Sequence, residues 1–231
     1  MTRPQIPDLT QRYFLGLDLG KRVDRSALAV LELQWEGKGF DYAWYVPIRN
    51  PIVRLIRADR FPLGLPYSQI PGILSSVLHK LERMPVLPGN DSKAFQKDLA
   101  VDAANAGSFL LEILQQQSLP ATLVPVSITG GERENRIHGG VWSVPRPILF
   151  SNLRILFEAG NLRIAHDLPG YRTLIEELLT AKASGPQREH DDVAIAVALA
   201  AWRAAREIPA LRQPHPERVI RSKGENIECC S

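Results

Sequence analysis

Cysteine is almost absent from the sequence, and the only two, Cys229 and Cys230, are adjacent near the C-terminus. Such a pair provides neither a disulfide framework nor, alone, the ligand set of a structural zinc site. No apolar run approaches the roughly 18 residues that a membrane span requires, and residues 1–12 lack the apolar segment of a signal peptide. We therefore expect a soluble, intracellular protein with no membrane partner.

Strong net charge and a nucleotide-binding loop are also lacking. The net charge of +3 permits a nucleic-acid partner without arguing for one. Apolar residues make up 45% of the chain, which is too many for a disordered protein and enough for a sizeable core. The stretch "GLDLGKR" comes closest to a P-loop, but its spacing is wrong and Arg22 stands where Ser or Thr is required.

The first part of the chain has the pattern of antiparallel strands. Residues 13–19 and 26–36 are rich in β-formers, and the glycines of "GKG" at 37–39 predict a turn to a third strand at 40–48. Residues 49–66 contain three prolines and four arginines and predict an irregular connector. The sequence therefore predicts an antiparallel meander at the start of the fold.

Helices and strands alternate in the rest of the chain. We expect helices at 67–84, 107–117, 146–160, 170–182 and 190–207, and strands at 97–103, 121–128 and 161–165. The polar, glycine-flanked segment from Gly130 to Gly140 predicts an arm that projects from the sheet. This order favours an α/β class with one mixed sheet covered by helices. We expect a single domain at 13–208, with an N-terminal extension at 1–12 and a mobile tail at 209–231.

Four aspartates lie at or near the ends of buried elements. Asp18 is flanked by leucines in the first strand, and Asp102 ends the strand "LAVD". Asp191 and Asp192 open the last helix. Taken singly, Asp102, Asp191 and Asp192 have an ordinary alternative role as helix caps or first-turn residues. That alternative is not available to Asp18, which lies within a strand.

Taken together, these aspartates predict a cation site. Parallel strands end at one edge of a sheet, where sites gather. Several carboxylates cannot stay ionised and close together without a cation. Hard divalent ions accept oxygen ligands, and two of them about 3.5–4 Å apart clamp the attacking and leaving oxygens of a phosphodiester.

Three segments carry a resemblance to a known family. "GLDLGKRVDRSALAVLEL", "LAVDAANAGSFLLEIL" and "HDDVAIAVALAAW" resemble the three acidic motifs of the nuclease domain of the phage terminase large subunit. That domain belongs to the RNase H-like superfamily, alongside RuvC-type resolvases. The resemblance covers roughly residues 13–206. It implies an RNase H-like mixed sheet, three antiparallel strands followed by parallel additions, with helices on both faces.

The same resemblance implies an activity and residue roles. The activity is cleavage of double-stranded DNA with two Mg²⁺ or Mn²⁺ ions, in the cytoplasm of a bacterial cell or a phage-infected host. Asp18 would bridge both ions, Asp102 would hold one, and Asp191 would complete the site. Asp192 would be a second ligand or an outer-shell partner. Asp24 is a further candidate ligand, with an ordinary turn aspartate as the equal alternative.

Exposed cations are the candidates for DNA contacts, because Lys and Arg contacts to phosphates supply most sequence-independent affinity. The candidates near the acidic motifs and in the arm are Lys21, Arg22, Arg25, Arg133 and Arg136. The four arginines at 49, 54, 57 and 60 form another candidate group. For each one, a solvated surface charge is the alternative.

Several alternatives stay open at this point. One is a RuvC-like, structure-specific resolvase, and another is a non-catalytic DNA-binding or assembly subunit with the same fold. A third is an actin-like phosphotransferase, because "DLG" at 18–20 matches a phosphate-binding turn, although no second such turn is present. A terminase large subunit also has an ATPase motor, so the chain is either a stand-alone protein or an excised domain. Its expected partners are therefore a separate packaging ATPase or a portal.

Overall fold

The computed structural model describes residues 10–20, 25–87, 90, 95–181, 191–208 and 211, without the side chains of 104–109. Their strands form one eight-stranded sheet in the order β6-β7-β5-β4-β1-β2-β3-β8. The strands are β1 (Gln11–Asp18), β2 (Ala27–Asp41), β3 (Val46–Arg60), β4 (Phe95–Asp102), β5 (Thr122–Thr129), β6 (Asn135–Arg136), β7 (Trp142–Pro145) and β8 (Leu162–Ile164). Strands β1, β2 and β3 are antiparallel neighbours, while β4, β5 and β7 add in parallel to β1. The predicted mixed sheet, with three antiparallel strands followed by parallel additions, is confirmed.

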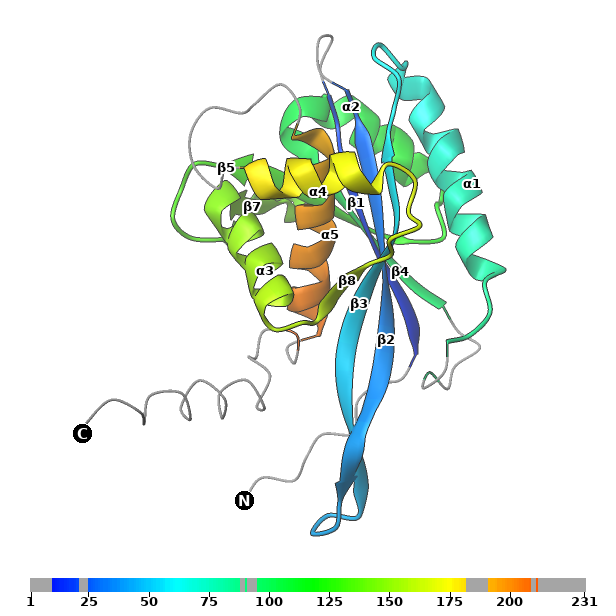
Figure 1. The fold of residues 1–231 in the computed structure, drawn as a ribbon. Helices are drawn as coiled ribbons and strands as arrows, with labels where there is room; N and C mark the ends of the chain where they lie inside the picture. Colours follow the sequence, from blue (N-terminus) through cyan, green and yellow to red (C-terminus); the bar gives the residue numbers. More distant parts are fainter. Residues whose placement is uncertain are drawn as a thin grey trace, which may run out of the picture.

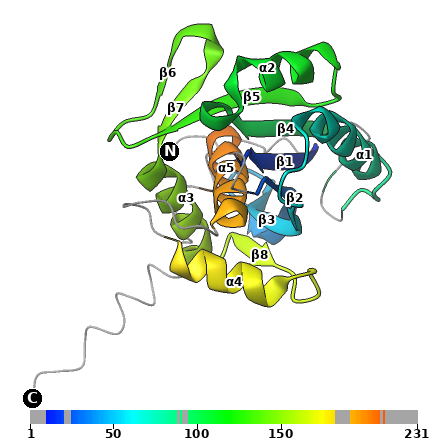
Figure 2. The ribbon, with the colours of Figure 1, turned by 90° about the horizontal axis from the view of Figure 1, so that it is seen from above.

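Helices cover both faces of the sheet (Figures 1 and 2). They are α1 (Ile70–Glu82), α2 (Ala103–Gln116), α3 (Arg146–Glu158), α4 (Tyr171–Thr180) and α5 (Asp192–Glu207), with short 3₁₀ turns η1 (Tyr67–Gln69) and η2 (His138–Gly140). On β1, Leu15 and Leu17 belong to the core shared with α1 and α2. Phe14 belongs to the core shared with α3, α4 and α5. Because side chains alternate along a strand, Gly16 and Asp18 are on the α5 side.

Helix α5 lies directly against the backbone of β1. A Cβ atom on Gly16 would be 2.0 Å from the carbonyl oxygen of Ala196 and 2.8 Å from the nitrogen of Ala200, so only glycine fits. From Ala196 back to Asp192 is about 6 Å along the helix, and from Gly16 on to Asp18 is about 6.6 Å along the strand. The contact therefore brings the start of α5 to the level of the end of β1, at the upper end of Figure 1.

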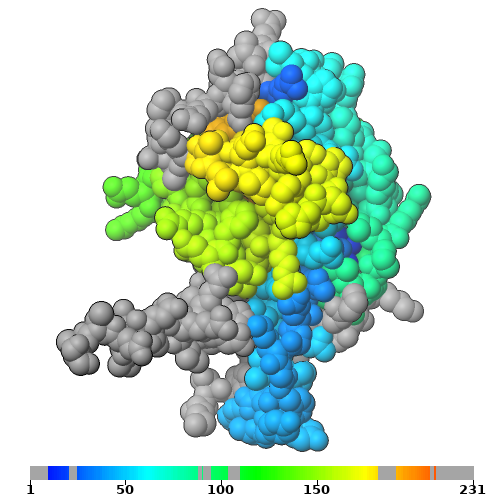
Figure 3. Space-filling model, viewed as in Figure 1, coloured from blue at the N-terminus to red at the C-terminus, as the bar shows by residue number. Residues whose placement is uncertain are grey.

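The β2–β3 hairpin is longer than predicted, and it protrudes from the body of the protein (Figure 3). The turn predicted at 37–39 is wrong, because β2 continues through the glycines to Asp41 with a register shift between Gly37 and Gly39. The real turn follows Asp41, whose Oδ1 accepts hydrogen bonds from the nitrogens of Ala43 (2.9 Å) and Trp44 (3.2 Å). The glycines thus form an irregularity within the strand, and an aspartate makes the turn.

The connector predicted at 49–66 is also wrong as far as Arg60. Residues 49–60 belong to β3, where Ile52, Val53 and Leu55 are buried. Pro51 is tolerated in this strand opposite Trp35. The apolar side chains of this segment therefore prevail over its proline and arginine content, because they complete the sheet between β2 and β8.

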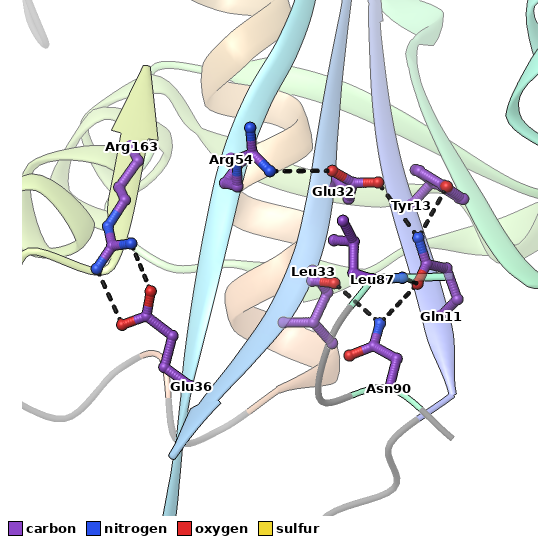
Figure 4. A network of polar contacts seen from close by, with 9 residues as sticks. All are labelled: Gln11, Tyr13, Glu32, Leu33, Glu36, Arg54, Leu87, Asn90 and Arg163. Carbon is purple, nitrogen blue, oxygen red and sulfur yellow. Dashed lines mark hydrogen bonds and ion pairs between the residues drawn. The ribbon is translucent and has the colours of Figure 1, made fainter. Parts of the chain in front are cut away.

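A buried polar network fastens the start of β1 (Figure 4). Oε1 of Gln11 accepts hydrogen bonds from the nitrogen of Leu87 (3.0 Å) and from Nδ2 of Asn90 (2.8 Å). Its Nε2 donates to the hydroxyl of Tyr13 (2.9 Å) and to Oε1 of Glu32 (3.2 Å). Burial raises the pKa of Tyr13 to about 12 and raises the pKa of Glu32. The network holds the segment after α1 onto the end of β1 that is opposite Asp18.

The two ends of the chain fall mainly outside the residues that the structure describes. Strand β1 already begins at Gln11, two residues before the predicted domain start. Residues 1–9, and all of the predicted tail 209–231 except Leu211, are outside the described residues. Within the described part, no helix combines the length and apolar character that crossing a membrane requires.

The contact of Gly16 with α5 predicts a large stability loss on substitution. Gly16→Ala places a methyl group against the backbone of α5, so we expect the free energy of unfolding to fall by about 3 kcal/mol, the upper end for overpacking. Urea unfolding followed by circular dichroism measures this change. The matched control is Gly72→Ala on α1, where an added Cβ meets nothing within 4 Å. That variant should gain up to about 1 kcal/mol from helix propensity. Equal effects of the two substitutions would contradict the proposed packing constraint.

Candidate active site

Two of the predicted aspartates lie side by side at one edge of the sheet. Asp18 is the last residue of β1, and Asp102 is the last residue of β4. These strands are parallel neighbours, with Leu17 paired to Val101, so the next residues along are the two aspartates. Their exposed fractions are only 2% and 3%. The fold therefore buries two carboxylates next to each other.

The other two aspartates come from the start of α5. Asp191 is the N-cap residue and Asp192 is the first helical residue, with exposed fractions of 4% and 5%. The side chain of Asp191 makes no capping hydrogen bond. Instead, the nitrogen of Ala194 donates to Oε1 of Glu177, on α4, at 2.9 Å. The capping alternative for Asp191 is therefore not what the structure has.

Electrostatics link all four carboxylates. Burial raises the pKa of Asp18 well above its usual value, and the negative charges of Asp102, Asp192 and Asp191 raise it further, in that order. The positive charge of Arg146 opposes this shift. The other three side chains are thus near enough to Asp18 for their charges to shift its pKa. The structure therefore brings together four residues from distant parts of the sequence.

Two arginines balance part of this negative charge. Arg146, at the start of α3, pairs with Asp191, and its guanidinium lies over the ring of Phe150 at 4.9 Å. Arg60, at the end of β3, pairs with Glu177, and its Nε is 3.7 Å from Oδ2 of Asp192. Of the other arginines on this strand, Arg54 pairs with Glu32 and Arg57 with Asp59.

Two residues of this arrangement were missed by the sequence reasoning. Arg146 lies between two prolines, and Glu177 is one of two adjacent glutamates on an amphipathic helix. No local signal distinguishes either from a surface charge. Their roles come from contacts between separate elements.

A tyrosine lies at the same edge. The hydroxyl of Tyr67, in η1, donates a hydrogen bond to the carbonyl of Gly20 at 2.6 Å. Burial raises the pKa of Tyr67, and the charges of Asp18 and Asp102 raise it further. Oγ of Ser26 accepts a hydrogen bond from the nitrogen of Gly20 at 3.1 Å. These bonds fasten the chain directly after Asp18.

The predicted DNA contacts have separate outcomes. Lys21 and Arg22, like the candidate ligand Asp24, lie outside the described residues. Arg25 is exposed two residues before β2, whose first residue pairs with Asp18. Arg133 and Arg136 are exposed in the arm. Arg136 is on β6, which is separated from β4 and its Asp102 by β7 and β5.

The arm is anchored on the later half of α5. Glu134 accepts a hydrogen bond from Nε1 of Trp202 at 2.8 Å and pairs with Arg206. Arg136 and Arg206 both lie near the ring of Trp142, at 5.4 and 3.8 Å from its centroid. Because Trp202 is ten residues after Asp192, this anchor is about 15 Å along the helix from the carboxylates.

The donor set suits a hard divalent cation. Oδ1 of Asp191 is buried without a hydrogen-bond partner among the described residues. A carboxylate oxygen in this position is the kind of donor that Mg²⁺ and Mn²⁺ accept. Within the described part of the chain, no three His, Cys, Asp or Glu side chains are placed so that they could hold a metal ion together. Asp191 and Asp192 are instead held by arginines.

Comparison with known proteins gives likenesses of fold. No protein-family model matches the chain, and no curated protein matches it significantly. The large terminase nuclease of thermophilic phage G20c, with bound zinc, is 19% identical over 82% of this chain and 80% of that chain (TM-score 0.48). The terminase nuclease domain of human cytomegalovirus is 12% identical over 88% and 86% (TM-score 0.48). RuvC of Thermus thermophilus is 16% identical over 83% and 92% (TM-score 0.32).

The raised pKa of Asp18 predicts a pH-dependent stability change. A carboxyl whose pKa is higher in the folded state stabilises the fold below its unfolded pKa of about 3.9, and this stability is lost as the pH rises through the folded pKa. In EDTA at neutral pH, Asp18→Asn should therefore melt above the wild type, by about 2–4 °C for each kcal/mol of relieved repulsion. The difference should disappear near pH 3.

The control for this experiment is Asp167→Asn, at an exposed position before α4. It should melt like the wild type across the same pH range. Melting curves from differential scanning fluorimetry suffice for all three proteins. If Asp18→Asn melts below the wild type in EDTA, Asp18 is a structural residue and the repulsion argument is wrong.

Proposed function

We propose that this protein is a divalent-metal-dependent endonuclease that hydrolyses double-stranded DNA by a two-metal mechanism. The observation that carries the proposal is the burial of Asp18, Asp102, Asp191 and Asp192 at one sheet edge, where the charges of the other three raise the pKa of Asp18. Without a cation, the repulsion between these carboxylates costs stability. A bound cation would neutralise that repulsion, so a cluster that is kept despite its cost indicates cation binding. The proposed role is terminase-like, in maturation or packaging of viral DNA, with a separate packaging ATPase or portal as partner.

Each carboxylate has a proposed position in the site. Asp18 and Asp102, which are neighbours in the sheet, would hold the ions from the ends of β1 and β4. Asp191 and Asp192 complete the site from the start of α5. When bound, the ions activate a water molecule and neutralise the charge that develops on the scissile phosphate. The rigid strands β1 and β4 keep two of the four carboxylates in fixed register, which is the chain's own contribution to orienting the reaction.

Arginines around the cluster have a second proposed role. Arg146 and Arg60 hold Asp191 and Asp192 within the site and offset their charge. Arg25, with Lys21 and Arg22, is proposed to contact phosphates beside Asp18, and Arg133 and Arg136 are proposed to contact DNA from the arm. The affinity then comes from phosphates rather than base edges, so little sequence preference is expected.

The proposal predicts metal-dependent cleavage of plasmid DNA. Purified protein should nick and linearise supercoiled plasmid in Mg²⁺ or Mn²⁺ and should do nothing in EDTA. Asp18→Asn and Asp102→Asn should each lower the rate by at least about 100-fold, because each removes a charge that holds the ions. Asp167→Asn is the control and should cut like the wild type. Cleavage that persists in EDTA, or in the Asp18→Asn/Asp102→Asn double variant, would exclude this mechanism.

The same proposal predicts the salt dependence of DNA binding. Binding of Asp18→Asn to a fluorescent duplex, measured by anisotropy in EDTA, should weaken steeply with salt. Adding Arg25→Ala should reduce the slope of log K against log salt by about 1, because one phosphate contact is lost. The control is Arg154→Ala, whose side chain is 78% exposed on α3 and pairs with Glu158. A slope that Arg25→Ala leaves unchanged would remove Arg25 from the interface.

A further inference from the structure

The first turn of α5 is capped by another helix. The first N–H groups of a helix have no partner within it and need an acceptor. Asp191 has the residue type and the place for this task but makes no capping bond. Oε1 of Glu177, on α4, accepts the hydrogen bond of Ala194 at 2.9 Å, and the backbone of Val193 also bonds to this carboxylate. Glu177 is buried, with an exposed fraction of 7%.

The other oxygen of Glu177 holds an arginine of the site. Oε2 of Glu177 pairs with Nη2 of Arg60, whose Nε lies 3.7 Å from Oδ2 of Asp192. Arg60 therefore divides its charge between two carboxylates. If Glu177 were absent, the guanidinium would be drawn to Asp192, because that would be its remaining anionic partner in this contact.

Capping and ion binding compete for the same carboxylate. An N-cap aspartate turns its oxygens toward the N–H groups of its own helix. Because Glu177 bonds these groups, Oδ1 of Asp191 stays buried without a hydrogen-bond partner in the described structure, and the charge of Asp191 acts on Asp18. Because Glu177 of α4 caps α5, the carboxylate of Asp191 remains available to the acidic cluster.

We propose that Glu177 is a positioning residue of the metal site: it caps α5 in place of Asp191 and holds Arg60 back from Asp192, so that both aspartates serve the cluster. This inference rests on the proposed function, since it concerns the same ions. Glu177 itself does not touch the ions. Partners that orient metal ligands typically contribute 10–100-fold to metal affinity.

The test is Mn²⁺ affinity of the full chain, measured by isothermal titration calorimetry without DNA. Glu177→Ala should raise the Kd for Mn²⁺ by about 10–100-fold. Glu177→Gln should lie between this variant and the wild type, because its amide oxygen still accepts the hydrogen bond of Ala194 while its charge is lost. The matched control is Glu176→Ala, the exposed neighbour on the same helix, which should bind like the wild type.

A merely structural cap gives a different result. In that case Glu177→Ala lowers the melting temperature but leaves the Kd within about twofold of the wild type, and the inference is overturned. If Glu177→Ala does not fold, Glu177→Asp replaces it. Its shorter side chain does not reach α5, so it should bind Mn²⁺ more weakly than Glu177→Gln, and the reverse order would overturn the inference.

Asp18→Asn separates this inference from the proposed function. If the wild type binds Mn²⁺ and Asp18→Asn does not, the metal site stands, and the Glu177 variants then decide the inference alone. If Asp18→Asn binds Mn²⁺ like the wild type, the proposed function fails, and the role of Glu177 fails with it.

Discussion

Helix α5 approaches β1 without an intervening side chain, and the geometry of the acidic cluster depends on this contact. Gly16 provides the space, and alanines on the helix fill it. The helix can then run along the strand with its start at the end of β1, where Asp18 lies. A larger side chain at Gly16 would displace the whole helix, and with it Asp191 and Asp192. The packing of α5 against β1 therefore also determines where the acidic residues of the site lie.

The charges at this edge show how the fold tolerates the cluster. Burial and three like charges raise the pKa of Asp18, so its ionised form is costly. Arg146 and Arg60 offset part of this cost by pairing with the aspartates of α5. They leave the carboxylates of the two strands, Asp18 and Asp102, next to each other. The protein has kept an arrangement that apolar residues would make more stable, which is typical of functional sites.

Local patterns in the sequence predicted all or part of β1, β2, β3, β4, β5 and β8 and pointed to the four aspartates, and they failed where tertiary contacts decide. Asp18 was identifiable because a carboxylate within an apolar strand has no capping role. Asp102 had that ordinary alternative and was identifiable only together with the other aspartates. The turn at 37–39 was wrong because glycines also serve as irregularities in a long strand, and Asp41 makes the turn instead. Glu177 was not predictable, because its contact with α5 joins helices whose spatial relation no local pattern encodes.

The most direct test of the central claim is anomalous diffraction from crystals of the protein soaked in manganese. The account predicts one or two anomalous peaks at the shared end of β1 and β4, coordinated by Asp18 and Asp102 and by Asp191 or Asp192. Coordination requires Arg146 or Arg60 to release an aspartate, so a shift of these side chains should accompany the peaks. The absence of any peak among the four aspartates, or a carboxylate of Asp102 turned away from Asp18, would contradict it.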